Sequence, residues 1–160
     1  MIAGERAVKV MKDTVRVRIE TGALDEVVRL ADGRHEMIIR IEDPKRMTRR
    51  GLILLVRKIV VLAKAKRLKR LVLSTESLRF KSLPIGNEDL GELCAINMLM
   101  AHHAFTEHLA KPKDGFPVID EIGIEGADRD FRRGLERGII IGIETNACRR
   151  LANLPGGDMT

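Results

Sequence analysis

The order of apolar and polar residues along the chain predicts alternating strands and helices. Apolar and charged residues alternate at 7–11 and 14–19, which is the period of strands that bury one face. Apolar runs at 37–41, 71–74 and 118–124 predict further strands, and helical spacing predicts helices over 23–31, 49–66, 87–109 and 128–152. This alternation implies right-handed crossovers and an α/β fold, with a mixed, mostly parallel sheet flanked by helices.

The expected helix ends follow from capping and breaking residues. Thr48 and Asn87 each stand before a helical pattern, where a side-chain oxygen can accept a backbone N–H of the first turn. Lys111-Pro112 is expected to end the helix that Asn87 begins, and Pro155 follows the last predicted helix. The helix at 23–31 is expected to close at Gly33.

Three glycines interrupt the last predicted helix, and each costs on the order of 1 kcal/mol relative to alanine. Gly134, Gly138 and Gly142 recur every four residues and therefore share one stripe. We favour close packing against another backbone over contact with a ligand. The neighbouring faces are expected to supply core from Phe131, Leu135, Ile139, Ile140, Ile143 and Ala147.

The composition limits the class of protein. At 160 residues the chain is one domain in size, and it has no Trp, no Tyr and four Phe, which argues against modules that stack nucleic-acid bases on aromatic side chains. The two cysteines, Cys94 and Cys148, are too few for a disulfide-stapled secreted scaffold and lie outside any CxxC pattern, so a cytoplasmic location is the simplest expectation. Both are expected to be buried small hydrophobes. No stretch reaches about 18 apolar residues, so no membrane partner is expected.

The net charge of +6 is concentrated in the middle of the chain. Residues 44–81 contain 13 basic residues and 1 acidic residue. Such a block is either the solvated face of a helix, which we favour, or a surface that contacts phosphates of duplex DNA. The candidate contacts are Arg49, Arg50, Arg57, Lys58, Lys64, Lys66, Arg67, Lys69 and Arg70, and Arg50, Arg57 and Lys64 are expected to share a stripe opposite the apolar face.

The sequence contains no self-sufficient active site. His102, His103 and His108 cluster near a predicted helix end, and His103 with Glu107 has the i, i+4 spacing that can hold a divalent metal. There is no HExxH pattern, so surface histidines are the interpretation we favour. The patterns GxGxxG, GxxxxGK[ST] and GxSxG are also missing from the sequence.

The segment 134–160 resembles the joint between the two domains of leucyl (cytosol) aminopeptidases. It has a glycine-punctuated helix, an Asn-x-x-Arg-x-Leu pattern at Asn146, Arg149 and Leu151, and then an Asn-x-Pro turn. The resemblance extends back to residue 37 through 37–48 and 95–113. His103 and His108 stand where that family has tyrosines, Arg150 stands where it often has an acid, and 1–36 match only vaguely.

The resemblance implies a non-catalytic amino-terminal domain over 1–145, with a macro-domain-like three-layer architecture. Residues 146–160 would begin the linker to a catalytic domain that lies beyond Thr160. That absent domain would hold two divalent metal ions, zinc or manganese, and would remove amino-terminal residues from peptides as part of a hexamer. This chain alone is then expected to be inactive, with no catalytic or metal-binding residue and no cofactor of its own. DNA binding by the basic block is the alternative function, and ADP-ribose binding rests only on the analogy with macro domains.

Overall fold

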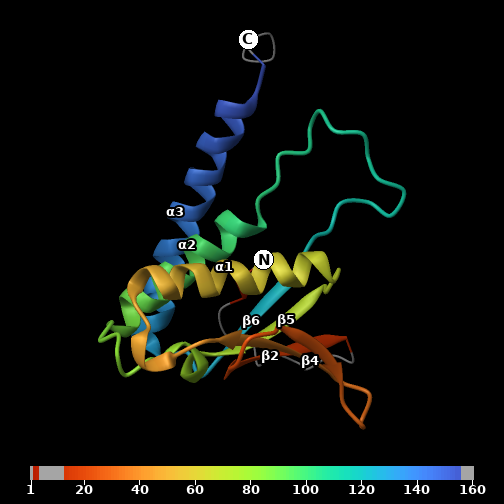
Figure 1. Cartoon of the computed structure of the whole chain (residues 1–160). Coiled ribbons are helices and arrows are strands. Elements are labelled where there is room, and N and C mark those ends of the chain that lie inside the picture. The colour runs from red at the N-terminus through yellow and green to blue at the C-terminus, as the bar shows by residue number, and fades with distance from the viewer. Residues whose placement is uncertain (1, 4–12, 156–160) are drawn as a thin grey trace.

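One mixed sheet forms the base of the domain in the computed structural model, which describes residues 2–3 and 13–155 (Figure 1). Its strands are β1 (Ile2–Ala3), β2 (Thr14–Thr21), β3 (Glu26–Arg29), β4 (His35–Ile41), β5 (Arg70–Ser74) and β6 (Glu121–Glu125). The strand order is β1-β6-β5-β2-β4-β3, and every neighbouring pair is parallel except β3 with β4. The predicted α/β class with a mostly parallel sheet is therefore confirmed.

The helices of the described residues are α1 (Arg49–Ala65), α2 (Asn87–His102) and α3 (Arg129–Asn153), with short 3-10 turns at Pro44–Arg46 and Thr75–Leu78. The hydroxyl of Thr48 accepts the Gly51 N–H at 3.1 Å, so the predicted cap of α1 is confirmed. The predicted cap of α2 is wrong by one residue, because Gly86 is the N-cap and Asn87 is already helical. α2 also ends at His102 rather than near 109, and residues 103–120 form a long loop.

The core is aliphatic, as the composition predicts. Side chains that alternate along the strands, such as Val15 and Val17 of β2 or Met37 and Ile39 of β4, are buried in one cluster with the helices. Phe131 of α3 is the one fully buried aromatic residue of the described chain. Since all these side chains share one cluster, α1, α2 and residues 129–142 of α3 cover the same face of the sheet.

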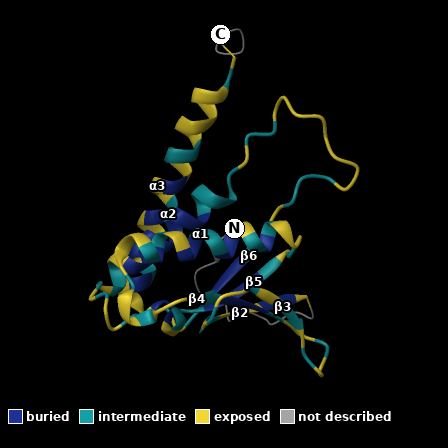
Figure 2. Cartoon of the chain, viewed as in Figure 1, coloured by how far each residue is buried: buried dark blue, intermediate teal, exposed yellow. Residues whose placement is uncertain are grey.

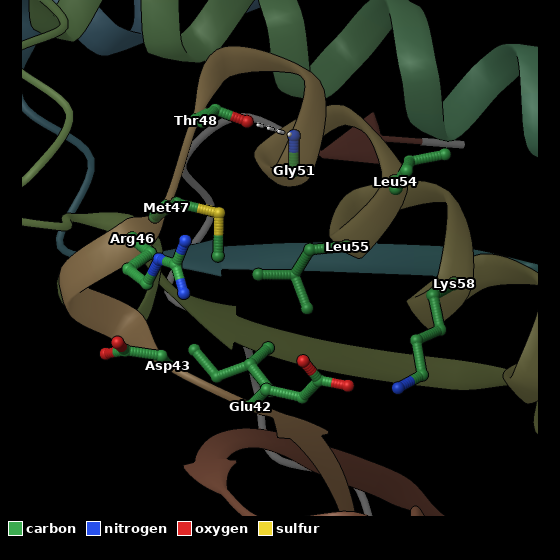
Figure 3. Close-up of a pocket in the computed structure, with 10 residues that line it drawn as sticks. Glu42, Asp43, Arg46, Met47, Thr48, Gly51, Leu54, Leu55 and Lys58 are labelled. Carbon is green, nitrogen blue, oxygen red and sulfur yellow. Dashed lines mark hydrogen bonds between the residues drawn. The ribbon is translucent and has the colours of Figure 1, made fainter.

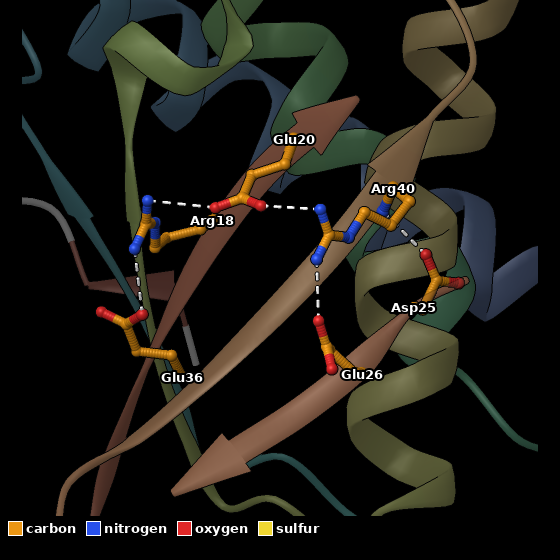
Figure 4. Close-up of polar contacts among 6 residues, drawn as sticks. All are labelled: Arg18, Glu20, Asp25, Glu26, Glu36 and Arg40. Atoms are coloured by element: carbon orange, nitrogen blue, oxygen red, sulfur yellow. Dashed lines mark hydrogen bonds and ion pairs between the residues drawn. The ribbon is translucent and has the colours of Figure 1, made fainter. Parts of the chain in front are cut away.

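The opposite face of the sheet carries a network of ion pairs (Figure 4). Arg40 of β4 contacts Glu20 of β2 at 2.8 Å and Glu26 of β3 at 2.7 Å, and Arg18 contacts Glu20 at 3.0 Å and Glu36 at 3.3 Å. These pairs join side chains across three adjacent strands. Each is partly exposed, so each contributes at most about 1 kcal/mol and the network mainly favours one register of the strands.

The predicted helix at 23–31 is wrong, because Glu26–Arg29 is the antiparallel strand β3. A tight turn joins it to β4, with Gly33 at φ +82° and the Asp32 carboxylate accepting the Arg34 N–H at 3.0 Å. An Asp-Gly pair before a strand is a hairpin signal, and here the hairpin prevails over a weak helical pattern. The predicted strand at 118–124 begins later, at Glu121, and the predicted strand at 7–11 lies outside the described residues.

α2 and α3 pack unusually closely along the predicted glycine stripe. A Cβ at Gly134 would lie 1.8 Å from the Glu88 carbonyl oxygen, and one at Gly138 would lie 2.5 Å from that of Glu92. The contact is reciprocal, since a Cβ at Gly91 of α2 would lie 2.1 Å from the Phe131 carbonyl oxygen. Close backbone packing is therefore confirmed as the reason for these glycines.

Candidate functional site at the junction of the helices

Side chains from α1 and α3 bind the carboxyl end of α2. Lys64 of α1 donates to the carbonyl oxygen of His102 at 2.8 Å. From α3, Asn146 donates to the Leu99 carbonyl oxygen at 3.0 Å, and Arg149 donates to that of Met100 at 2.9 Å. We call Lys64, Asn146, Arg149, His102 and His103 the junction cluster.

The physical reason for this arrangement is the polarity of a helix end. The last carbonyl groups of an α-helix have no partner within the helix and carry partial negative charge, which cations stabilise. Arg149 also donates to the side-chain oxygen of Asn146 at 3.1 Å, which aligns both groups on the same turn of α3. The Asn-x-x-Arg pattern of the sequence therefore fixes α3 to the end of α2.

The two histidines of the junction are less accessible than surface histidines, so the surface interpretation is wrong for them. The ring Nε2 of His102 accepts the Ile119 N–H at 3.1 Å, which ties the end of the 103–120 loop to α2. The Nε2 atom of His103 is buried without a hydrogen-bond partner. Burial lowers the pKa of both rings, and nearby positive charges, Lys64 for His102 and Arg149 with Lys64 for His103, lower it further. The environment therefore favours the neutral form of both histidines.

The metal-binding pair considered for His103 and Glu107 does not form. Glu107 lies beyond the end of α2 and pairs with Arg150 of α3, which lowers the pKa of its carboxyl group. His108 is exposed and packs its ring against Phe105 at a centroid distance of 5.7 Å. Across residues 2–3 and 13–155, no three His, Cys, Asp or Glu side chains are grouped so that they could hold a metal ion.

The structure divides the nine basic residues predicted as phosphate contacts. Arg57 and Lys64 do not face solvent opposite the core as predicted, because Arg57 donates to the buried Asn97 at 2.8 Å and Lys64 binds the end of α2. Lys58 pairs with Asp25 at 2.8 Å.

The rest of the basic block lies at the two ends of α1 or beyond it. Arg67 donates to the Asp114 and Gly115 carbonyl oxygens, and Arg70 on β5 approaches Glu121 at 3.9 Å. Four of the nine residues have no ion-pair partner among the described residues: Arg49, Arg50, Lys66 and Lys69. About 24 Å of helix separates Arg49 and Arg50 from Lys66 and Lys69. DNA binding by this block stays a prediction.

The two cysteines differ in environment. Cys94 of α2 is fully buried, which raises the pKa of its thiol to about 12 and confirms the expectation of an inert hydrophobe. Cys148 is exposed, so the expectation of burial is wrong for it. The same holds for Ile140, which lies on the side of α3 opposite the glycine stripe, and for Ile143 and Ala147, which follow the last buried residue, Gly142.

A cavity of about 530 Å³ lies between the carboxyl end of β4 and the start of α1 (Figure 3). Open α/β sheets commonly bind ligands at this edge. Its lining combines apolar side chains such as Met47 and Leu55 with two acidic and two basic residues, which are Glu42, Asp43, Arg46 and Lys58. Because the acidic and basic residues balance, the charge of the lining does not indicate a phosphate-bearing ligand, and ADP-ribose binding stays a prediction.

The second half of α3 projects away from the domain (Figures 1 and 2). We call residues 129–142 the packed half and residues 143–153 the projecting half. The buried residues of α3 end at Gly142, and no residue of the projecting half is buried. No described helix, α3 included, is both long enough and apolar enough to cross a membrane.

Comparison with known proteins identifies the fold. No protein-family model and no curated protein sequence matches the chain. Among solved structures, the bottromycin maturation enzyme BotP in complex with Mn superposes with a TM-score of 0.70 at 17% identity, over 94% of this chain and 34% of that one. A mutant of tomato leucine aminopeptidase superposes with a TM-score of 0.69 at 8% identity, over 99% of this chain and 39% of that one. The chain thus spans just over a third of these enzymes, and it has the α/β fold of that part of them.

Proposed function

We propose that this chain is the non-catalytic amino-terminal domain of a metal-dependent aminopeptidase of the leucyl aminopeptidase type, and that α3 is its connector to the catalytic domain. The fold supports the proposal, because nearly the whole chain superposes on part of a leucine aminopeptidase. The sequence resemblance supports it independently, because it falls on the segment that makes the junction.

The observation that carries the proposal is the contrast along α3 around the junction cluster. Asn146 and Arg149, the residues of the resembling motif, hold the helix to the end of α2, and beyond them α3 is exposed on all sides. A helix without a buried face is typical of a bridge between domains. The junction therefore sets the direction in which the connector leaves this domain.

The catalytic chemistry would belong to the other domain. The described residues offer no site for the two divalent ions, zinc or manganese, that leucyl aminopeptidases use, and the related structure of BotP contains Mn. This domain would position and support the catalytic one within a hexamer in the cytoplasm. Alone, it would not hydrolyse peptides.

The proposal is tested by the mass and activity of the native protein. An antibody raised against this chain should detect a species of about 45–50 kDa in the source organism, the size given by the share of the related chains that this domain covers. That species should release the amino-terminal residue of leucine p-nitroanilide when Mn²⁺ or Zn²⁺ is added, whereas the 160-residue chain should not. A native species of 17.9 kDa without such activity would overturn the proposal.

A further inference from the structure

α1 and α3 carry exposed stripes with the same spacing and opposite charge. The α1 stripe consists of Arg50, Leu54, Lys58, Val61 and Ala65. The α3 stripe consists of Glu136, Ile140, Glu144, Ala147 and Leu151. In both stripes the order is charged, apolar, charged, apolar, apolar. Successive residues are four, four, three and four positions apart. This spacing keeps each stripe within an arc of about 80° on its helix.

Both stripes face solvent. Leu54 and Val61 are 55% and 57% exposed, and Ile140 and Leu151 are 63% and 53% exposed. Four large aliphatic side chains at such exposure on two regular stripes are more than the scattered apolar residues of an ordinary surface. Within one chain the stripes do not meet, because α1 and α3 each pack against α2.

The charges of the stripes are largely available. Arg50, Glu136 and Glu144 are exposed and have no ion-pair partner among the described residues. Lys58 is engaged within its own chain, because its ammonium pairs with Asp25 at 2.8 Å and donates to the Arg40 carbonyl oxygen at 3.0 Å. Two α3 stripes facing each other would bring glutamates together, and two α1 stripes would bring basic residues together. Only the pairing of α1 with α3 places opposite charges beside matching apolar residues.

We propose that the α1 stripe of one copy of this chain docks on the α3 stripe of a second copy. The two stripes are different surfaces, so the contact either forms twice in a two-fold dimer or repeats head to tail around a ring or along an open chain. One helix pair buries less than the ~800 Å² per partner of a standard stable interface, and a single contact is therefore weak and depends on concentration. The inference does not rest on the proposed function.

Complementation between blocked variants tests the pairing. The first variant, Arg50→Glu with Val61→Ser, blocks the α1 stripe, and the second, Ile140→Ser with Glu144→Lys, blocks the α3 stripe. All four side chains are exposed, so both variants should keep the thermal unfolding transition of the parent chain. Sedimentation velocity from about 1 µM to about 500 µM would then measure association of the parent chain, of each variant and of their equimolar mixture.

The parent chain should associate as its concentration rises, and each variant alone should do so at least about tenfold more weakly. The mixture should form a heterodimer, because the intact α3 stripe of the first variant meets the intact α1 stripe of the second. Lys69→Glu, an exposed charge reversal outside both stripes, should associate like the parent chain.

Three results would overturn the pairing. The first is a parent chain that stays monomeric at every concentration. The second is full self-association of either variant, which would show α1 pairing with α1 or α3 with α3. The third is a mixture in which the two variants do not associate. None of these results bears on the mass or the peptidase activity of the native protein, so the two proposals can fail separately.

Discussion

The two halves of α3 are parts of one continuous helix, yet different forces act on them. The packed half lies against α2 so closely that Gly134 and Gly138 leave no room for a side chain. The projecting half has no buried residue, and its Ile143 and Leu151 side chains are each 53% exposed. Asn146 and Arg149 mark the last contacts with α2.

This difference teaches that the amphipathic pattern of a helix does not by itself identify what covers it. Phe131 and Leu135 of the packed half are buried by this domain, whereas Ile143 and Leu151 of the projecting half also recur at helical spacing and are exposed. A regular apolar stripe is typical of a helix face that packs against another surface. Whether the covering surface belongs to the same domain depends on where the neighbouring helix ends.

The largest expected effect comes from adding a methyl group to the packed half. Gly134→Ala should lower the free energy of unfolding by about 3 kcal/mol or more, because its Cβ would overlap a backbone carbonyl that cannot move without separating the helices. Gly142→Ala should have a much smaller effect, because the nearest atom, at 2.8 Å, belongs to the flexible Leu99 side chain, and alanine gains about 1 kcal/mol in helix propensity.

Urea denaturation of the glycine series would measure this gradient, with Gly138→Ala expected between the other two, since its Cβ would lie 2.5 Å from a carbonyl oxygen. Equal losses at the three positions would show that helix propensity, and not close packing, explains the glycines.

The point where the two halves meet should show an intermediate effect. Asn146→Ala and Arg149→Ala should each lower the free energy of unfolding by about 1 kcal/mol, because each leaves a carbonyl group at the end of α2 without its side-chain donor. Hydrogen exchange of the His103 amide, which is bonded to the Leu99 carbonyl oxygen at 3.0 Å, should become faster in both variants. Cys148→Ala, on the exposed side of the same turn, is the matched control and should leave both measurements unchanged. Unaltered exchange in Arg149→Ala would remove the junction as an anchor.

Much of this architecture can be predicted from sequence periodicity. The central strands, the Thr48 cap and the glycine contact all follow from local patterns, because alternation, capping and four-residue spacing report directly on which face is buried. The pattern at 23–31 is ambiguous because it is short, and the Asp32-Gly33 turn was the signal that could have identified the hairpin. Local chemistry predicts such elements wherever one signal dominates.

The junction could not be predicted in the same way. The Asn-x-x-Arg pattern is visible in the sequence, but its partners are main-chain carbonyl groups of α2, and main-chain groups leave no signature in a sequence. The sequence predicts His103 and Glu107 on one face of a helix, but α2 ends at His102, so the two residues do not share a helical face. Both the carbonyl partners of the Asn-x-x-Arg pattern and the place of His103 depend on where α2 ends. That end is bound by the tertiary contacts of Lys64, Asn146 and Arg149.

The smallest effect should come from acid acting on the junction. Burial lowers the pKa of His102 and His103 below the ordinary value of 6.5, so the unfolded chain binds protons at a higher pH than the folded one. The two neutral histidines therefore make their full contribution to the free energy of unfolding above about pH 6.5. That contribution is lost as the pH falls below 6.5. Three carboxyl groups also have lowered pKa values in the folded chain, those of Glu88, Glu107 and Asp128. In the unfolded chain they protonate only near their ordinary pKa values, which are 4.5 for Glu and 3.8 for Asp.

The interval between about pH 5 and pH 6.5 consequently isolates the histidines from these carboxyl groups. In thermal unfolding, the parent chain should lose stability across this interval, and the loss should be smaller in His103→Gln, which has no ring to protonate. His35→Gln is the matched control, because His35 is exposed on β4 and lies outside the junction. If His35→Gln reduced the loss as much as His103→Gln, the pH dependence would arise from the histidines in general. A reduction confined to His103→Gln would place it where the packed half of α3 gives way to the projecting half.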